Sequence, residues 1–263
     1  MTAVSDPLKL TGVVLRTVDY GESDRVVALF TEERGKVSAF ARGARASRRR
    51  FGGALEPFTL LRAEARERRS ADLLALESVS VVRGFGGIRG DLARIACASY
   101  ACDLARALVR DAEPHPQLMA LLVEILGRLD IEPARPTQLR AYELGALQAA
   151  GLMPRFSNCA RCGGALGASG SGRLTFDPAE GGALCEACAS AAPPGAGAPR
   201  LARATADALA RLQAGGLAAA AAHPMSPGEG VEAREALSRF IEHHLGRRLA
   251  SRKFLDEIGP LLG

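Results

Sequence analysis

Hydrophobic side chains in the first 82 residues recur at every second position, in short runs that end at turn-forming residues. The segment from Lys36 to Arg42 alternates between two sets of side chains, as a strand with one buried face does. Turn-forming segments, for example Gly21 to Asp24, separate these runs. The pattern predicts strands over residues 8–18, 25–31, 36–41, 58–65 and 73–82.

These strands leave one long connection, residues 43–57. A module of this size with five short strands is typical of a small, partly open barrel of the oligonucleotide-binding (OB) type. An SH3-like barrel fits the strand count almost as well. We therefore expect a small β-barrel, with the OB fold as the first choice.

From Asp91 onward the apolar period changes to that of an α-helix. Helices are predicted over residues 92–108, 118–129, 136–150, 203–215 and 230–258. The predicted fold class is a multidomain α+β protein, in which an N-terminal OB-fold β-barrel precedes an α-helical domain with an inserted four-cysteine zinc knuckle. We place the barrel at residues 1–83, the two parts of the helical domain at 84–156 and 193–263, and the zinc-binding insertion at 157–192.

The zinc prediction comes from two Cys-x2-Cys pairs, which flank residues 163–184 and supply Cys159, Cys162, Cys185 and Cys188. This spacing is typical of a tetrahedral metal knuckle. Two redox-active dithiols are the alternative, less favoured because no βαβ pattern surrounds either pair. Four thiolates complete the coordination of zinc and leave no position for water. We therefore expect one structural zinc ion per chain.

Basic residues outnumber acidic ones, 34 to 29, and the excess is greatest in the N-terminal part. One stretch without an acidic residue contains a cluster of arginines, namely Arg42, Arg45, Arg48, Arg49 and Arg50. Positive charges this close together favour a phosphate backbone as the partner. Phe51 follows the cluster and is a candidate for stacking on bases, with Tyr20 as a second candidate. Core packing explains either ring equally well.

A second basic group lies near the C-terminal end of the sequence and consists of Arg247, Arg248, Arg252 and Lys253. It is a possible secondary DNA-binding surface. Cations that complement the C-terminus of a helix explain the group at least as well.

The sequence offers no recognisable active site. Gly35 and Lys36 lack the rest of a phosphate-binding loop, and the four histidines have no partner at catalytic or ligand spacing. A zinc-dependent hydrolase or deaminase would need three metal ligands with a nearby His or Glu. We expect a protein that is not an enzyme. No apolar run has membrane length and Met1 to Pro7 carry no secretion signal, so a cytoplasmic protein without membrane contact is expected.

Several segments, taken in chain order, resemble the bacterial recombination mediator family RecO (recombination protein O). In the barrel they are Val14 to Arg16, Asp19 to Val26, Phe30 to Lys36, Ala41 to Arg45 and Leu55 to Phe58. Further along they are Glu143 and Leu144, Gly151 to Pro154, Cys159 to Gly163, Phe176 to Pro178, Gly181 and Gly182, Leu184 to Cys188, Phe240 and Ile241, Leu245 and Gly246, and Ser251 and Arg252.

The resemblance implies a non-enzymatic role in the repair of DNA double-strand breaks and gaps. Such a protein binds single- and double-stranded DNA and anneals complementary strands coated with the single-strand-binding protein SSB, whose C-terminal tail it engages. It acts with RecR to help load RecA, and its location is cytoplasmic and nucleoid-associated. Some family members lack the four cysteines, which favours a structural zinc. The alternative is an OB-fold zinc-ribbon factor that binds RNA in transcription or translation.

Overall fold

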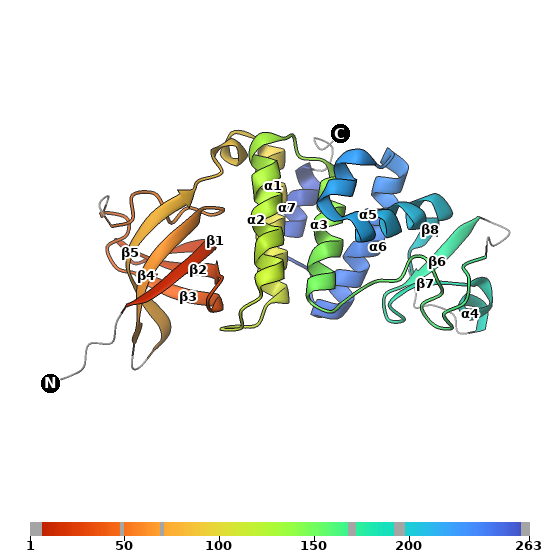
Figure 1. Ribbon diagram of the computed structural model, residues 1–263, viewed down its shortest axis with the longest axis horizontal. Coiled ribbons are helices and arrows are strands. Elements are labelled where there is room, and N and C mark those ends of the chain that lie inside the picture. Colours follow the sequence, from red (N-terminus) through yellow and green to blue (C-terminus); the bar gives the residue numbers. More distant parts are fainter. Residues whose placement is uncertain (1–6, 48–49, 69–70, 168–171, 192–197, 259–263) are drawn as a thin grey trace. The chain divides into compact units, whose positions relative to one another are not determined.

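The computed structural model describes residues 7–47, 50–68, 71–167, 172–191 and 198–258. The chain divides into two compact units, Met1–Glu132 and Pro133–Gly263. In Figure 1 the first unit is coloured from red to yellow-green and the second from green to blue. The domain limits given above stay a prediction.

The first unit begins with a closed five-stranded barrel, so the predicted OB-like barrel is confirmed. Its strands are β1 (Leu8–Tyr20), β2 (Asp24–Thr31), β3 (Gly35–Ala41), β4 (Leu60–Arg68) and β5 (Ala71–Arg83). Their order around the barrel is β1-β2-β3-β5-β4. The paired strands are antiparallel except β3 and β5, which run parallel.

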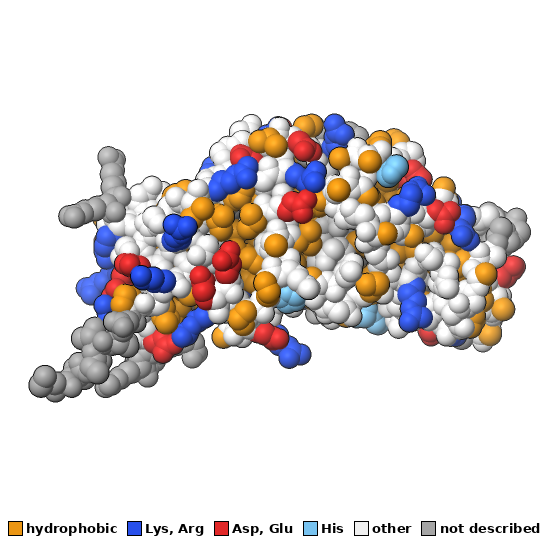
Figure 2. Space-filling model, viewed as in Figure 1, with side chains coloured by type: hydrophobic (Ala, Val, Ile, Leu, Met, Phe, Trp, Pro, Cys, Tyr) orange, Lys and Arg blue, Asp and Glu red, His pale blue; other side chains and the backbone are white. Residues whose placement is uncertain are grey.

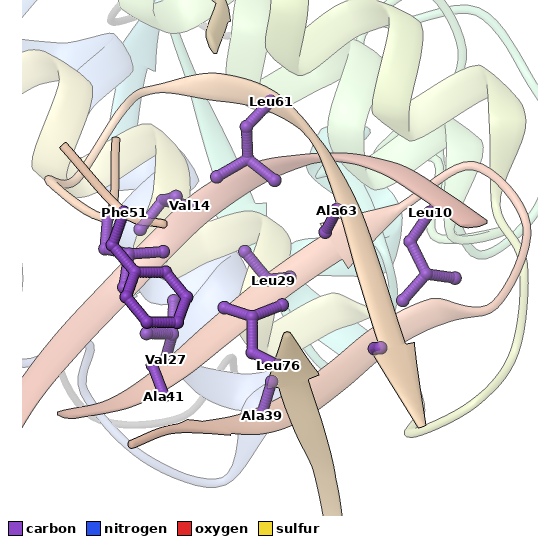
Figure 3. Close-up of a cluster of buried hydrophobic side chains, with 12 residues drawn as sticks. Leu10, Val14, Val27, Leu29, Ala39, Ala41, Phe51, Leu61, Ala63 and Leu76 are labelled. Atoms are coloured by element: carbon purple, nitrogen blue, oxygen red, sulfur yellow. The ribbon is translucent and has the colours of Figure 1, made fainter. Parts of the chain in front are cut away.

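Inward-facing side chains from every strand fill the barrel (Figure 3). They include Leu10, Val14, Val27, Leu29, Ala39, Ala41, Leu61, Ala63 and Leu76. Phe51 and Leu55, from the connection between β3 and β4, complete the same core. Burial of one such side chain contributes about 1.5–3 kcal/mol, so this connection is anchored to the barrel by its own apolar residues.

A short 3-10 helix, η1 (Gly86–Gly90), follows the barrel, and helices α1 (Leu92–Leu108) and α2 (Pro116–Ile131) complete the first unit. The side chain of Asp91 accepts a hydrogen bond from the Arg94 N–H at 2.8 Å and so caps the start of α1. Pro116 occupies the first turn of α2, where its missing N–H costs no hydrogen bond. Both helices occur where the apolar period predicted them.

Gly35 and Lys36 join the barrel to the end of α1. Lys36 Nζ donates hydrogen bonds to the carbonyl oxygens of Arg106 at 3.2 Å and Val109 at 3.1 Å. These carbonyls belong to the last turn of α1 and the residue after it, where a cation is favoured. A Cβ atom on Gly35 would lie 1.8 Å from the carbonyl oxygen of Glu113, so only glycine fits. The pair therefore has a packing role.

The second unit combines helices with a small sheet. Its helices are α3 (Pro136–Ala149), α4 (Glu186–Ala191), α5 (Arg203–Ala222), α6 (Pro227–Leu245) and α7 (Ser251–Ile258). The strands β6 (Arg173–Asp177), β7 (Gly182–Leu184) and β8 (Arg200–Ala202) form an antiparallel sheet in the order β7-β6-β8. Helix α3 packs against α5 and α6.

The carboxylate of Glu232 on α6 ties this sheet to the helices. It accepts hydrogen bonds from the Ala202 N–H at 2.8 Å, from Thr205 Oγ1 at 2.6 Å and from Arg173 at 2.7 Å. Burial alone would raise the pKa of Glu232, but these donors lower it below its ordinary value. A charged Glu232 thus connects β6, β8, α5 and α6.

The predicted helix over residues 230–258 is wrong in one respect, because it is two helices. Gly246 has φ of +67° and ends α6, a conformation that glycine adopts without strain. The chain then turns before α7 begins at Ser251. The predicted helix over 203–215 continues to Ala222 with a kink at Gly216. Within the described residues, none of the helices has both the length and the apolar character needed to cross a membrane.

Candidate metal centre and nucleic-acid interface

The four cysteines of the two pairs lie together in the second unit. The Sγ atoms of Cys159, Cys162, Cys185 and Cys188 are all within 4.8 Å of one another. Cys162 Sγ and Cys185 Sγ are 3.8 Å apart. A zinc tetrahedron with bonds of about 2.3 Å has edges of about 3.8 Å, so the sulfur positions fit such an ion. Within the described residues, this is the one group of three or more potential ligands close enough to hold a metal.

A tight turn holds the first cysteine pair, and the junction of a strand and a helix holds the second. In the first, the Gly163 N–H donates to the Cys159 carbonyl at 2.9 Å, and the Cys159 N–H donates to the Gly164 carbonyl at 2.8 Å. Gly163 has φ of +74°, which its turn requires. The second pair begins directly after β7, and α4 carries Cys188. The glycines therefore permit the first turn, while the β7–α4 junction positions the second pair.

The thiols differ in acidity because their surroundings differ. Burial would raise the pKa of Cys159, but backbone N–H groups of Cys162, Cys185 and Arg161 lower it to about 6. The neighbouring side chains of Cys185 and Cys162 raise the pKa of Cys188 to about 12. One thiolate is thus stabilised while crowding disfavours a second. A divalent cation would displace the remaining protons and offset the repulsion between thiolates.

Side chains around the cluster connect it to the rest of the unit. Arg161 donates to the Cys188 carbonyl at 2.7 Å and to Glu180 at 2.9 Å, so it links the two cysteine pairs. The Phe156 and Phe176 rings stack with centroids 5.6 Å apart, and Phe176 lies 6.2 Å from Phe240 on α6. No sequence pattern indicates the Arg161 contact, because exposed arginines are common.

The other two cysteines are buried and lie on α1. Cys97 and Cys102 each expose 2% of their surface. Burial raises the pKa of Cys102 to about 12, so its thiol stays protonated and unreactive near neutral pH.

The described arginines of the basic cluster are exposed on the connection between β3 and β4. They are Arg42, Arg45 and Arg50, whereas Arg48 and Arg49 lie outside the described residues. Arg45 donates to the Glu22 carbonyl at 3.0 Å, and Arg50 donates to the Arg42 carbonyl at 2.8 Å. Ala44, Arg45, Ser47, Gly52 and Gly53 line a hollow of about 460 Å³ beside them. Figure 2 shows basic and acidic side chains interspersed over the visible face of the barrel.

Phe51 does not fit the predicted role in base stacking. Its side chain is only 2% exposed and belongs to the barrel core (Figure 3). Burial of this ring in the apolar interior is favourable because it removes the apolar surface of the ring from water. Arg50 lies over the ring, with its guanidinium carbon 5.0 Å from the centroid. Tyr20, the second candidate, is 62% exposed.

The C-terminal basic group is largely engaged with carboxylates. Arg252 is 6% exposed and pairs with Asp256 at 2.9 Å, and Arg248 contacts the same carboxylate at 2.7 Å. Lys253 lies 3.9 Å from Glu257. Arg247 is exposed just after the end of α6. These contacts favour a role for Arg248 and Arg252 within the fold, while DNA binding by this group stays a prediction.

Comparison with known proteins identifies the family of the chain. The family model described as "Recombination protein O N terminal" matches residues 5–85, and the model described as "Recombination protein O C terminal" matches residues 89–253. The "DNA repair protein RecO" of Anaeromyxobacter sp. (strain Fw109-5) is 69% identical over 99% of this chain and 100% of the relative. The protein of the same name from Myxococcus xanthus is 49% identical over 94% of this chain and 96% of that relative.

The chain combines an OB-like barrel with a helical unit that contains a four-cysteine cluster. It is thus a two-part protein with a candidate structural metal centre. The chain belongs to the recombination protein O family, whose two models match it in chain order. Membership supports a role in recombinational DNA repair.

Proposed function

We propose that this protein is a non-enzymatic recombination mediator, which binds single- and double-stranded DNA and anneals complementary strands coated with SSB. The match to both family models carries the proposal. In this role the protein engages the C-terminal tail of SSB and acts with RecR to help load RecA at breaks and gaps. The relatives compared above are named for DNA repair, which supports the same role.

The arginines of the connection between β3 and β4 supply the phosphate contacts in this proposal. Arg42, Arg45 and Arg50 are exposed, and Arg48 and Arg49 lie between them in sequence. Guanidinium groups bind phosphate oxygens whatever the base sequence, and an annealing protein requires such sequence-independent contacts. They also screen the repulsion between two phosphate backbones that are brought together. Annealing then draws on binding energy, without nucleotide hydrolysis.

Zinc is the metal we assign to the four cysteines, with one ion per chain. Soft thiolate ligands and tetrahedral geometry favour zinc over magnesium or calcium. Cys159, Cys162, Cys185 and Cys188 would occupy every position of that ion, so its contribution is to hold β7, α4 and the first turn together. The DNA contacts are assigned to the barrel.

A comparison of nucleic acids tests this proposal against the RNA-binding alternative. Single-stranded DNA, duplex DNA and RNA of equal length are titrated at one fixed salt concentration, because phosphate contacts make affinity depend on salt. We expect both DNA forms to bind at least as tightly as RNA. Binding to RNA about tenfold tighter than to either DNA, a difference of ~1.4 kcal/mol, would contradict the mediator and favour the alternative.

A further inference from the structure

The four thiols of the candidate metal centre differ in how far solvent reaches them. Cys162 is exposed, Cys185 and Cys188 are half-buried, and Cys159 has no exposed surface. The two thiols on α1 are buried as well. Oxidation of cysteines follows their exposure. A dissolved oxidant therefore meets the sulfur of Cys162 before any other thiol of the chain.

Two glycines leave the sulfur of Cys162 uncovered. Gly163 and Gly164 follow it directly and are exposed. A Cβ atom on Gly164 would lie 3.4 Å from Cys162 Sγ, in van der Waals contact with the sulfur. Any side chain at this position would cover one side of the sulfur, whereas glycine leaves that side to solvent.

A second thiol lies within reach of Cys162. Cys185 Sγ is 3.8 Å from Cys162 Sγ, so side-chain rotation has to close about 1.8 Å to reach the S–S bond length of about 2.05 Å. The two sulfurs belong to different pairs. Arg161 also links these pairs, because it donates to the Cys188 carbonyl at 2.7 Å, a contact that needs no metal. An accessible thiol thus has a partner beside it that can form a disulfide.

We propose that Cys162 and Cys185 form a peroxide-sensitive modification site, at which oxidation to a disulfide releases the metal. The inference rests on the zinc assigned in the proposed function. The Cys162 thiolate attacks hydrogen peroxide, the O–O bond breaks, and the hydroxide that leaves takes up a proton to give water. This two-electron oxidation of the sulfur gives a sulfenic acid. The Cys185 thiolate then attacks that sulfur, the S–S bond forms, the S–O bond breaks, and a second hydroxide leaves as water.

This disulfide removes two of the four ligands. Cys159 and Cys188 are then the only thiolates left, and two ligands do not complete the tetrahedron of a structural zinc site. Loss of the ion removes its contribution to the stability of the second unit. The disulfide still joins the two pairs, so reduction by a thiol restores all four ligands in place. Metal content is thereby coupled reversibly to oxidation.

Peptide mapping of the oxidised protein tests which cysteines react. The zinc-loaded chain is treated with hydrogen peroxide, free thiols are alkylated, and the chain is cut with trypsin and a glutamyl endopeptidase. Cleavage occurs after Arg155, Arg161, Arg173, Glu180, Glu186 and Arg200, which places the four cysteines in four different peptides. We expect one dominant cross-link, between peptides 162–173 and 181–186. A dominant cross-link between peptides 156–161 and 162–173, within the first pair, would overturn the assignment.

Zinc release is followed on the same samples with a chromophoric chelator. We expect one zinc per chain to be released in parallel with the cross-link, and to be bound again after dithiothreitol and zinc are added. Retention of zinc and of four free thiols in excess hydrogen peroxide would overturn the proposal. A purified protein that binds no zinc at all would instead contradict the zinc assignment in the proposed function.

Two variants that keep all four ligands test the role of access. The φ angle of Gly164 is not positive, so alanine fits there without strain. Gly164→Ala should keep one zinc per chain and the wild-type melting temperature, but release zinc more slowly in peroxide. Cys97→Ala with Cys102→Ala should release zinc at the wild-type rate, because the buried thiols take no part. Equal release rates for Gly164→Ala and the wild type would contradict attack at the uncovered sulfur of Cys162.

Discussion

Replacing Cys159 and Cys162 together by serine should abolish zinc binding and destabilise the second unit. Serine hydroxyls stay protonated at neutral pH, so the variant keeps only two of the four thiolate ligands. A structural zinc site contributes about 10–16 kcal/mol of apparent binding energy in small zinc-finger peptides. Even a loss of about 3 kcal/mol would lower the melting temperature by roughly 10 °C. Zinc content and melting temperature are measured on the same samples.

The matched control for this experiment removes the two cysteines outside the cluster. Cys97→Ala with Cys102→Ala keeps all four ligands, and it should retain one zinc per chain even if the loss of two buried thiols lowers stability. A Cys159→Ser, Cys162→Ser protein that stays fully loaded with zinc and melts like the wild type would contradict the structural role.

Replacing Arg45, Arg48, Arg49 and Arg50 together by alanine should produce the largest loss of DNA affinity. Each phosphate contact on single-stranded DNA contributes about 0.7 to the slope of log K against log salt. If all four arginines contact phosphates, the slope should fall by about 3, and binding should weaken about equally for all sequences. The measurement is a salt titration with two oligonucleotides of unrelated sequence.

A charge-matched variant in the second unit serves as the control. Arg203, Arg211, Arg234 and Arg239 are exposed on α5 and α6, and replacing them by alanine removes the same charge. Its salt slope should stay at the wild-type value. An unchanged slope in the variant of the connection would place the DNA elsewhere, for example along Arg247 to Lys253.

The alternating pattern predicted the barrel well because each strand has one face in a common core. Lys36 to Arg42 alternates, and the structure places Ala39 and Ala41 inside the barrel. The same pattern does not predict the position of Phe51, because residues 43–57 have no period that separates an inward from an outward side chain. An aromatic ring that follows a run of arginines predicts base stacking on DNA. In the structure the ring instead packs in the barrel core, a contact between residues distant in sequence that no local pattern reveals.

In the second unit the sequence predicted the metal site formed by the four cysteines but not the small sheet, whose strand β7 ends directly before Cys185. The spacing of the pairs is a local signal, and the sulfur atoms lie within 4.8 Å of one another as it requires. Strands β7 and β8 have three residues each, too few to show a period. The link from Glu232 to Ala202 and Arg173 joins residues far apart in sequence, which no local pattern reveals.

Nucleotide-free annealing tests the central claim most directly. Complementary DNA strands are coated with cognate SSB, and duplex formation is followed with and without this protein, with and without ATP, and with SSB that lacks its C-terminal tail. We expect the protein to accelerate annealing to the same extent with and without ATP, and to lose this effect when the tail is removed. Acceleration that strictly requires ATP would contradict the account of a mediator driven by binding energy alone.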